Sequence, residues 1–128
     1  MNRHRPSILL VDDEPDFSAG LCDILGELSY DVAVASDGLS ALELARVQPF
    51  DVAVVDYRLP GMNGVELMAQ LRRAQPPART VLLSAYVSHE VAAAARQTGC
   101  HIVLNKPVDL PRLLETVADL LRLDPPSC

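Results

Sequence analysis

Five short, continuously apolar runs constrain the fold of this chain more than any other feature of its sequence. They lie at residues 8–11, 32–35, 52–55, 81–83 and 102–104. A strand with one exposed face alternates apolar and polar residues, whereas a strand covered by helices on both faces is apolar throughout. The runs therefore predict a sheet buried between two layers of helices, which is typical of parallel strands.

The segments between these runs repeat their apolar residues at helical spacing. Residues 17–28, 41–45 and 65–71 show this pattern, and residues 110–121 show it most clearly. A further helix predicted at residues 88–98 has a small core face because alanines dominate it. Strand and helix thus alternate five times, which predicts an α/β fold with a parallel sheet and right-handed crossovers.

Length and composition narrow the class of protein. The 128 residues are enough for one domain. Acidic residues outnumber basic ones by 17 to 11, and the net charge of −6 disfavours direct contact with nucleic acid or anionic lipid. No apolar run is long enough for membrane insertion. Three cysteines without metal-binding spacing are typical of a reduced, cytoplasmic protein, and Cys22 and Cys100 are predicted to be buried small side chains.

Polar side chains follow four of the five predicted strands, where an open α/β sheet binds its ligands. Asp12 and Asp13 follow the first run, Asp56 the third, Ser84 the fourth and Lys106 the fifth. Lys106 is also the single lysine among eleven basic residues. We therefore expect three carboxylates, a hydroxyl and an amine to converge at one edge of the sheet.

Three neighbouring carboxylates repel one another and need a cation. Their hard oxygen atoms, without a nearby histidine or cysteine ligand, favour Mg²⁺, Mn²⁺ or Ca²⁺ over zinc, and a shell with room for water and a phosphoryl oxygen suits Mg²⁺ best. A carboxylate beside a metal can also act as a nucleophile and form an aspartyl phosphate. The amine and the hydroxyl would then stabilise the oxygens of a bound anion.

Four motifs in this order resemble the receiver domain of two-component response regulators. They lie at residues 11–14, 56–64, 84–85 and 106–107. The resemblance covers residues 7–123 and leaves residues 124–128 as a tail or the start of a linker. It implies a flavodoxin-like fold, with a five-stranded parallel sheet in the order 2-1-3-4-5 and five flanking helices.

The resemblance also implies a phosphoryl-transfer function. Asp56 would accept a phosphoryl group from a phosphohistidine of a sensor histidine kinase or a histidine phosphotransfer protein. Lys106 and Ser84 would hold the phosphoryl oxygens, so that the chain would catalyse only its own phosphorylation and dephosphorylation and would not be an enzyme otherwise.

The metal site is implied in the same way. Asp13, Asp56 and the backbone carbonyl of Arg58 would bind Mg²⁺ directly, and Asp12 would act through water. A cis peptide bond before Pro107 would place the preceding lysine.

Output is expected through contacts of the fourth helix, fifth strand and fifth helix with an unknown downstream protein. A phosphorylation-dependent dimer is also compatible with the family. Val103 departs from the family pattern, because many receivers carry an aromatic residue at this position, and we expect altered coupling. Arg58 and Tyr86 are bulky at positions that control water access, which predicts slow loss of the phosphoryl group.

Three other functions compete with this interpretation. A phosphatase of the haloacid dehalogenase kind needs a second acid where this chain has Arg58. A flavodoxin-like cofactor site needs a phosphate cradle where this chain is acidic. A constitutive interaction module that is never phosphorylated remains the main alternative. His4, His89 and His101 are scattered along the sequence and are assigned no role.

Overall fold

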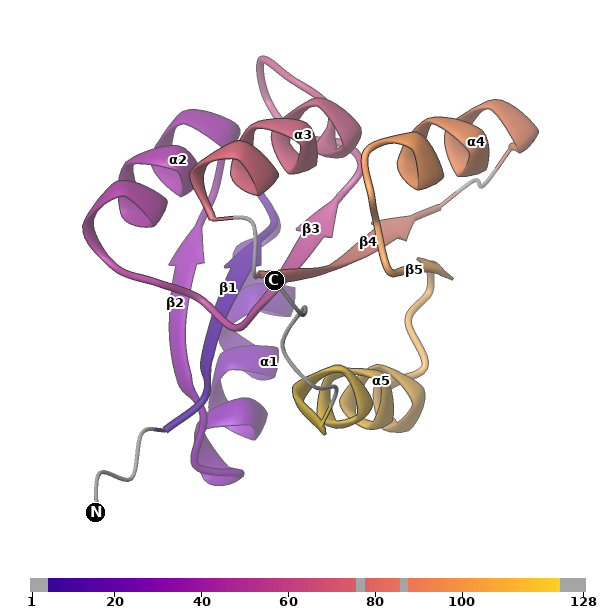
Figure 1. Cartoon of the computed structure of the whole chain (residues 1–128). Coiled ribbons are helices and arrows are strands. Elements are labelled where there is room, and N and C mark those ends of the chain that lie inside the picture. The colour runs from indigo at the N-terminus through magenta and orange to yellow at the C-terminus, as the bar shows by residue number, and fades with distance from the viewer. Residues whose placement is uncertain (1–4, 76–77, 86–87, 123–128) are drawn as a thin grey trace.

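A computed structural model describes residues 5–75, 78–85 and 88–122 of the chain. Its centre is a five-stranded parallel sheet in the order β2-β1-β3-β4-β5 (Figure 1). The strands are β1 (Ser7–Val11), β2 (Asp31–Ala35), β3 (Val52–Asp56), β4 (Arg79–Ser84) and β5 (Ile102–Asn105). The helices are α1 (Pro15–Glu27), α2 (Gly38–Val47), α3 (Gly64–Ala74), α4 (His89–Gln97) and α5 (Leu110–Arg122). The predicted fold class, strand order and number of helices are confirmed.

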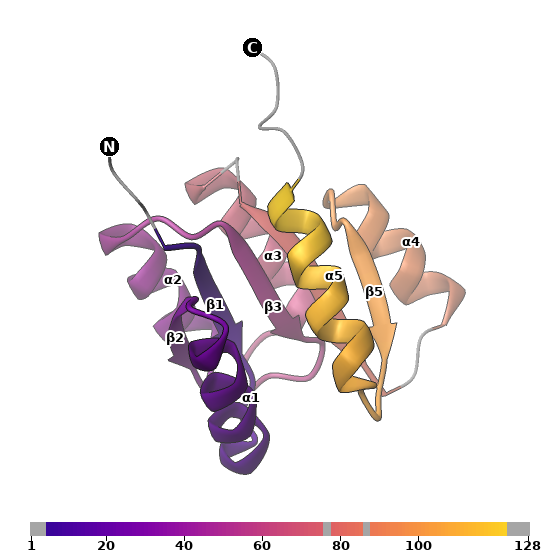
Figure 2. The same cartoon turned by 90° about the horizontal axis from the view of Figure 1, so that it is seen from below.

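Helices cover both faces of the sheet. Helices α2, α3 and α4 pack on one face, and α1 and α5 pack on the other (Figures 1 and 2). Neighbouring residues of one strand therefore enter different cores: Leu9 and Val11 join the cluster under α2–α4, while Ile8 and Leu10 join the cluster under α1 and α5. This two-sided burial explains why the strands are apolar throughout.

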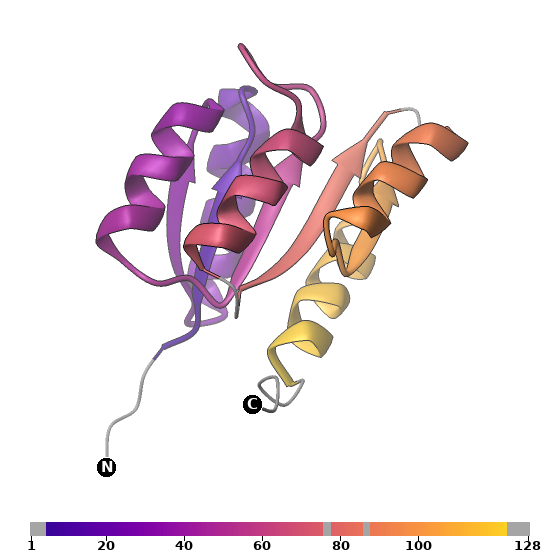
Figure 3. The same cartoon turned by 45° about the horizontal axis from the view of Figure 1, so that its top comes forward.

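Helices α2, α3 and α4 begin on the edge of the sheet where the strands end (Figure 3), and a side chain caps the start of each. The carboxylate of Asp37 accepts a hydrogen bond from the Ser40 N–H at 2.7 Å and begins α2. Asn63 and Glu66 form a reciprocal capping box at the start of α3. Such caps satisfy backbone donors that a helix leaves unpaired. They fix the loops that surround this edge.

The turn between β3 and α3 requires a glycine. A Cβ atom on Gly64 would lie 2.5 Å from the backbone oxygen of Asp56 and 2.8 Å from the side chain of Leu82. The Gly64 N–H also donates to the carbonyl of Tyr57 at 2.7 Å. The close approach holds the start of α3 directly against the end of β3.

The structure corrects one prediction about the interior. Cys22 and Cys100 are only partly buried. Cys22 lies on α1 beside Val34 of β2, which is an edge strand, so that little of the protein covers it. Cys100 precedes the opposite edge strand, and its thiol donates to the carbonyl of Ile102 at 3.1 Å. Position at a sheet edge, which the local sequence does not reveal, decides the exposure of both.

The domain limits of 7–123 stay a prediction: β1 begins at Ser7 and α5 ends at Arg122, and residues 123–128 lie outside the described part. Within the described residues, none of the helices combines the length and hydrophobicity that crossing a bilayer would require.

Candidate functional site

Four strands bring the predicted site residues to one edge of the sheet. The parallel register aligns Val11 with Val55, Asp56 with Leu83, and Ser84 with Asn105. Residues that follow β1, β3, β4 and β5 therefore emerge at a similar level. Three carboxylates gather there, and one oxygen atom from each of them lies within 4.8 Å of the others: Asp12, Asp13 and Asp56.

The two adjacent aspartates face different surroundings. Asp12 is 2% exposed, and its carboxylate accepts a hydrogen bond from the Glu14 N–H at 2.9 Å. Burial raises the pKa of Asp12, and the Glu14 N–H and Lys106 only partly oppose that rise. Asp13 is exposed and lines the cavity above the sheet. Asp13 is therefore the accessible carboxylate of the pair, and Asp12 is the buried one.

Asp56 is buried at the end of β3, with both carboxylate oxygens engaged. One oxygen accepts from the amine of Lys106 at 3.0 Å. The other accepts from the Arg58 N–H at 3.3 Å. The Tyr57 N–H donates to the carbonyl of Leu83 at 2.8 Å, which ties the segment after β3 to β4. The carboxylate is thus held at the floor of the site.

Lys106 is the cation of the cluster. Its Nζ lies 3.0 Å from Asp56, 3.5 Å from Asp12 and 3.8 Å from Glu14. Burial alone would lower the pKa of Lys106, but these three carboxylates outweigh that effect and raise it. The backbone N–H of Lys106 donates to the backbone carbonyl of Ser84 at 2.8 Å. The peptide bond to Pro107 is cis, as the resemblance predicted.

A cavity of about 570 Å³ lies over these groups. Asp13, Asp56, Lys106 and the buried Ser84 line it, so the predicted hydroxyl shares one space with the carboxylates and the amine. Glu90, from the first turn of α4, lines it as well. Tyr86, predicted to control water access, lies outside the described residues.

The donor set fits a hard divalent cation. The group of described residues whose geometry could hold a metal ion offers carboxylate oxygens alone. Oxygen ligands select Mg²⁺ or Ca²⁺ over the metals that prefer nitrogen or sulfur. Arg58 lines the same cavity, as a ligand through its backbone carbonyl would require.

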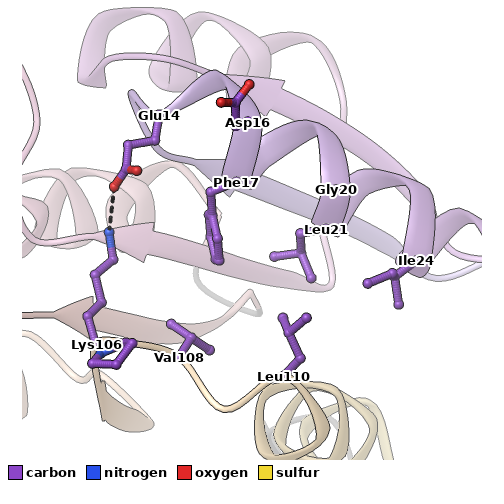
Figure 4. Close-up of a pocket in the computed structure, with 10 residues that line it drawn as sticks. Glu14, Asp16, Phe17, Gly20, Leu21, Ile24, Lys106, Val108 and Leu110 are labelled. Carbon is purple, nitrogen blue, oxygen red and sulfur yellow. Dashed lines mark ion pairs between the residues drawn. The ribbon is translucent and has the colours of Figure 1, made fainter.

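A second, apolar cavity of about 450 Å³ adjoins the site between α1 and the start of α5 (Figure 4). Glu14 and Lys106 stand at one end of it, and Phe17, Leu21 and Ile24 of α1 form one wall. The sequence analysis did not identify this cavity. Its walls come from segments almost 90 residues apart in the sequence, so no local pattern could indicate it.

The structure adds Glu14, Phe17 and Glu90 to the predicted site residues. Glu14 belongs to the motif at residues 11–14, which was a usable signal because it follows two aspartates directly. Phe17 was interpreted as part of the apolar face of a helix, and it does pack there. Glu90 has no signal in the sequence, since only the position of α4 brings it over Asp56.

Residues 8–118 match the family model of the response regulator receiver domain. The chain is 43% identical over 107 residues to a response regulator receiver protein of Anaeromyxobacter sp. (strain Fw109-5), covering 84% of this chain and 45% of that protein. It is 38% identical over 123 residues to the response regulator protein PilR of Pseudomonas aeruginosa, covering 96% of this chain and 28% of that protein. The chain thus spans less than half the length of these curated relatives.

Solved receiver structures have the same fold. The non-phosphorylated HemR receiver domain of Leptospira biflexa matches with a TM-score of 0.90 at 27% identity, covering 97% of this chain and all of that one. A response regulator of Burkholderia pseudomallei, solved with a phosphorylated aspartic acid and a calcium ion, matches with a TM-score of 0.80 at 30% identity, covering 89% of this chain and 72% of that one.

Phosphoaspartate and Mg²⁺ are typical of this family, whose members generally act as signalling modules that interact with histidine kinases and downstream effectors. The strand order, the acidic cluster at the strand ends and the match over residues 8–118 lead to one assignment. The chain belongs to the receiver domain family of two-component response regulators.

Proposed function

We propose that this chain is a phosphoacceptor in which Asp56 receives a phosphoryl group from a phosphohistidine. The observation that carries the proposal is the meeting of three carboxylates with the amine of Lys106, 3.0 Å from Asp56, beneath one open cavity. An acidic cluster that contains an amine can bind an anion once a metal ion neutralises the excess negative charge of the carboxylates. The donor would be a sensor histidine kinase or a histidine phosphotransfer protein.

In the transfer, a carboxylate oxygen of Asp56 forms a bond to phosphorus while the bond between phosphorus and the histidine nitrogen breaks. The electron pair of that bond stays on the imidazole, which leaves with the donor protein. Phosphoryl transfer of this kind has a loose transition state, so that positioning and charge stabilisation provide most of the catalysis. The protein therefore needs no further nucleophile or base for this step.

The surrounding residues hold the reacting groups. Lys106 would follow the charge from the Asp56 carboxylate to the phosphoryl oxygens, and the Ser84 hydroxyl would donate to one of them. The Arg58 N–H already fixes one oxygen of Asp56. Mg²⁺ bound by Asp13, Asp56 and the Arg58 carbonyl, with Asp12 acting through water, would supply the charge that lets an anionic donor approach.

Dephosphorylation removes the negative charge that the phosphoryl group adds at Asp56. A water oxygen attacks phosphorus, the bond to Asp56 breaks, and the carboxylate and inorganic phosphate are released. Arg58 lines the cavity that this water must enter. We propose that its side chain slows the reaction, and Arg58→Ala is expected to shorten the lifetime of the phosphorylated state. An unchanged lifetime would exclude that role.

We propose that output passes through the face formed by α4, β5 and α5. Phosphorylation adds nearly two negative charges, in a cavity that the first turn of α4 also lines. The proposed receiver unit is 7–123, acting in the cytoplasm by contact with a downstream protein or by phosphorylation-dependent dimerisation. Direct contact with nucleic acid is not proposed for this unit, whose net charge is −6 over the full sequence.

The test is the intact mass of the protein after incubation with acetyl phosphate and Mg²⁺. We expect one phosphoryl adduct that disappears when Mg²⁺ is chelated and is absent in Asp56→Asn, which keeps the shape of the side chain. A protein that binds Mg²⁺ but takes no phosphoryl group would contradict the proposal. That result would favour the constitutive interaction module.

A further inference from the structure

The amine of Lys106 is bounded on one side by the beginning of α1. Nζ lies 5.6 Å from the centre of the Phe17 ring and 3.8 Å from the carboxylate of Glu14 (Figure 4). Both residues belong to the same short stretch: Glu14 is the N-cap of α1, and Phe17 is in its first turn. The amine is therefore contacted both by the aspartates at the ends of β1 and β3 and by the start of α1.

The two contacts from α1 act on the lysine differently. The side chain of Glu14 is 68% exposed, so its carboxylate attracts the amine toward solvent. The Phe17 ring packs against the apolar core under α1 and α5, and its face attracts a cation within about 6 Å. The ring therefore competes with the exposed carboxylate for the amine.

The surroundings give the lysine room to move. Its side chain is 18% exposed and forms part of the lining of the apolar cavity between α1 and α5. A lysine has a flexible four-carbon stem, and Phe17 stands between Lys106 and the rest of that cavity (Figure 4). Without the ring, the stem could occupy the cavity and withdraw the amine from the acidic cluster.

We infer that Phe17 is a positioning residue for phosphoryl transfer, which acts by holding the amine of Lys106 beside Asp56. The inference rests on the proposed function, because it assigns the ring a role in that reaction. Phe17 itself makes no contact with the reacting atoms. The ring keeps the amine where the phosphoryl oxygens will lie. The entropic cost of positioning the amine is therefore not incurred during the reaction.

The chain offers an unusually direct test because Lys106 is its single lysine. Protein made with isotope-labelled lysine gives NMR signals from this one side chain, without any assignment problem. A small amount of Mn²⁺ added to the acidic cluster would relax the protons next to the amine, with a steep dependence on their distance from the cluster. Phe17→Leu should weaken that relaxation, Phe17→Tyr should keep it, and Ile24→Leu, which alters the same cavity away from the lysine, should leave it unchanged.

The same four proteins are then phosphorylated with acetyl phosphate and Mg²⁺, and the rate is followed by intact mass. Phe17→Leu should lower the rate roughly three- to tenfold, in proportion to a cation–π contact of ordinary strength. Phe17→Tyr should keep the wild-type rate of phosphorylation, and so should Ile24→Leu. Thermal unfolding of each variant shows that it is folded at the temperature of the assay.

Two results would overturn the inference. A slower Phe17→Leu protein with unchanged relaxation of the lysine signals by Mn²⁺ would show that the ring has only a structural role. Weakened relaxation with an unchanged rate would show that holding the amine does not assist the reaction. A wild-type protein that accepts no phosphoryl group would overturn the proposed function itself, and that failure is recognised before any Phe17 variant is measured.

Discussion

Helices α4 and α5 flank the same edge strand, β5, from opposite faces of the sheet, yet they are attached to it very differently (Figure 2). Helix α5 buries four residues: Leu113, Thr116, Val117 and Leu120. Helix α4 buries Ala95 alone among its described residues. Burial of a large apolar side chain stabilises a protein by about 1.5–3 kcal/mol, and alanine contributes much less. Helix α5 is therefore firmly fixed, and α4 is weakly held.

Of these two helices, the weakly held α4 is the one whose start lines the cavity above Asp56. Ser88 and Glu90, at the start of α4, line the cavity above Asp56. A new charge in that cavity acts directly on a helix that has few buried contacts to lose. We therefore expect α5 to be the fixed part of the proposed output face and α4 to be its adjustable part.

The largest expected effect is a loss of stability when one core side chain of each helix is shortened to alanine in turn. Leu113→Ala should lower the free energy of unfolding by about 2–5 kcal/mol, because it leaves a cavity in the core. Val91→Ala on α4 should cost about 1 kcal/mol, since Val91 is only partly buried. Urea unfolding measures both values. Equal losses would contradict the comparison.

The next effect concerns Val103 on β5, which is half-buried and packs on the side of α4. Val91 and Ala95 of α4 and Cys100, which follows that helix, belong to or pack against the same core as Val103. Val103→Tyr adds a ring that has to displace or support α4. We expect phosphorylation to change hydrogen exchange in α4 about tenfold more than in the wild type, within the usual range of allosteric coupling.

Hydrogen exchange in α5 serves as the internal control for the Val103→Tyr protein. The exchange there should respond equally to phosphorylation in both proteins. An unchanged response in α4 would mean that the missing aromatic residue does not limit the coupling.

A smaller effect is expected at the cap of α4. The Ser88 hydroxyl accepts a hydrogen bond from the Val91 N–H at 3.1 Å. Ser88→Ala should weaken α4 by about 1 kcal/mol, the usual loss for a helix cap. Because α4 is weakly held, this loss should appear as faster local exchange of its amides. Asn63→Ala, at the capping box of α3, is the matched control and should leave exchange in α4 unchanged.

The sequence predicted the sheet because both of its faces are covered, which forces a strand such as 52–55 to be apolar throughout. It predicted the position of Asp56 and Lys106 because parallel strands end at one edge. The alanines of residues 92–95 also indicated a small core face, which the shallow attachment of α4 confirms.

Contacts between distant segments could not be predicted in this way. The Phe17 ring beside Lys106 depends on how α1 lies across the sheet, and helical periodicity identifies Phe17 only as apolar. The difference between Asp12 and Asp13 depends on which of two adjacent side chains the following loop covers. His101, assigned no role from the sequence, accepts a hydrogen bond through an alignment of β4 with the start of β5 that only the fold creates.

That hydrogen bond leads to the smallest expected effect, a pH dependence at the far end of β5. The Nδ1 of His101 accepts from the Thr80 N–H at 3.2 Å, so the bond requires the neutral ring. Burial, followed by the charges of Arg72 and Arg79, lowers the pKa of His101 from 6.5. The unfolded chain therefore takes up this proton first, and stability should fall as the pH drops below 6.5 through the lowered value.

The measurement is the free energy of urea unfolding between about pH 5 and pH 8, a range that brackets the ordinary pKa of histidine. His101→Gln keeps an acceptor but does not titrate, so its stability should fall less than that of the wild type on the acidic side. His89→Gln, which alters an exposed histidine on α4, should follow the wild type. If His101→Gln instead followed the wild type, the acid sensitivity would arise elsewhere, and the β4–β5 end of the sheet would have no part in it.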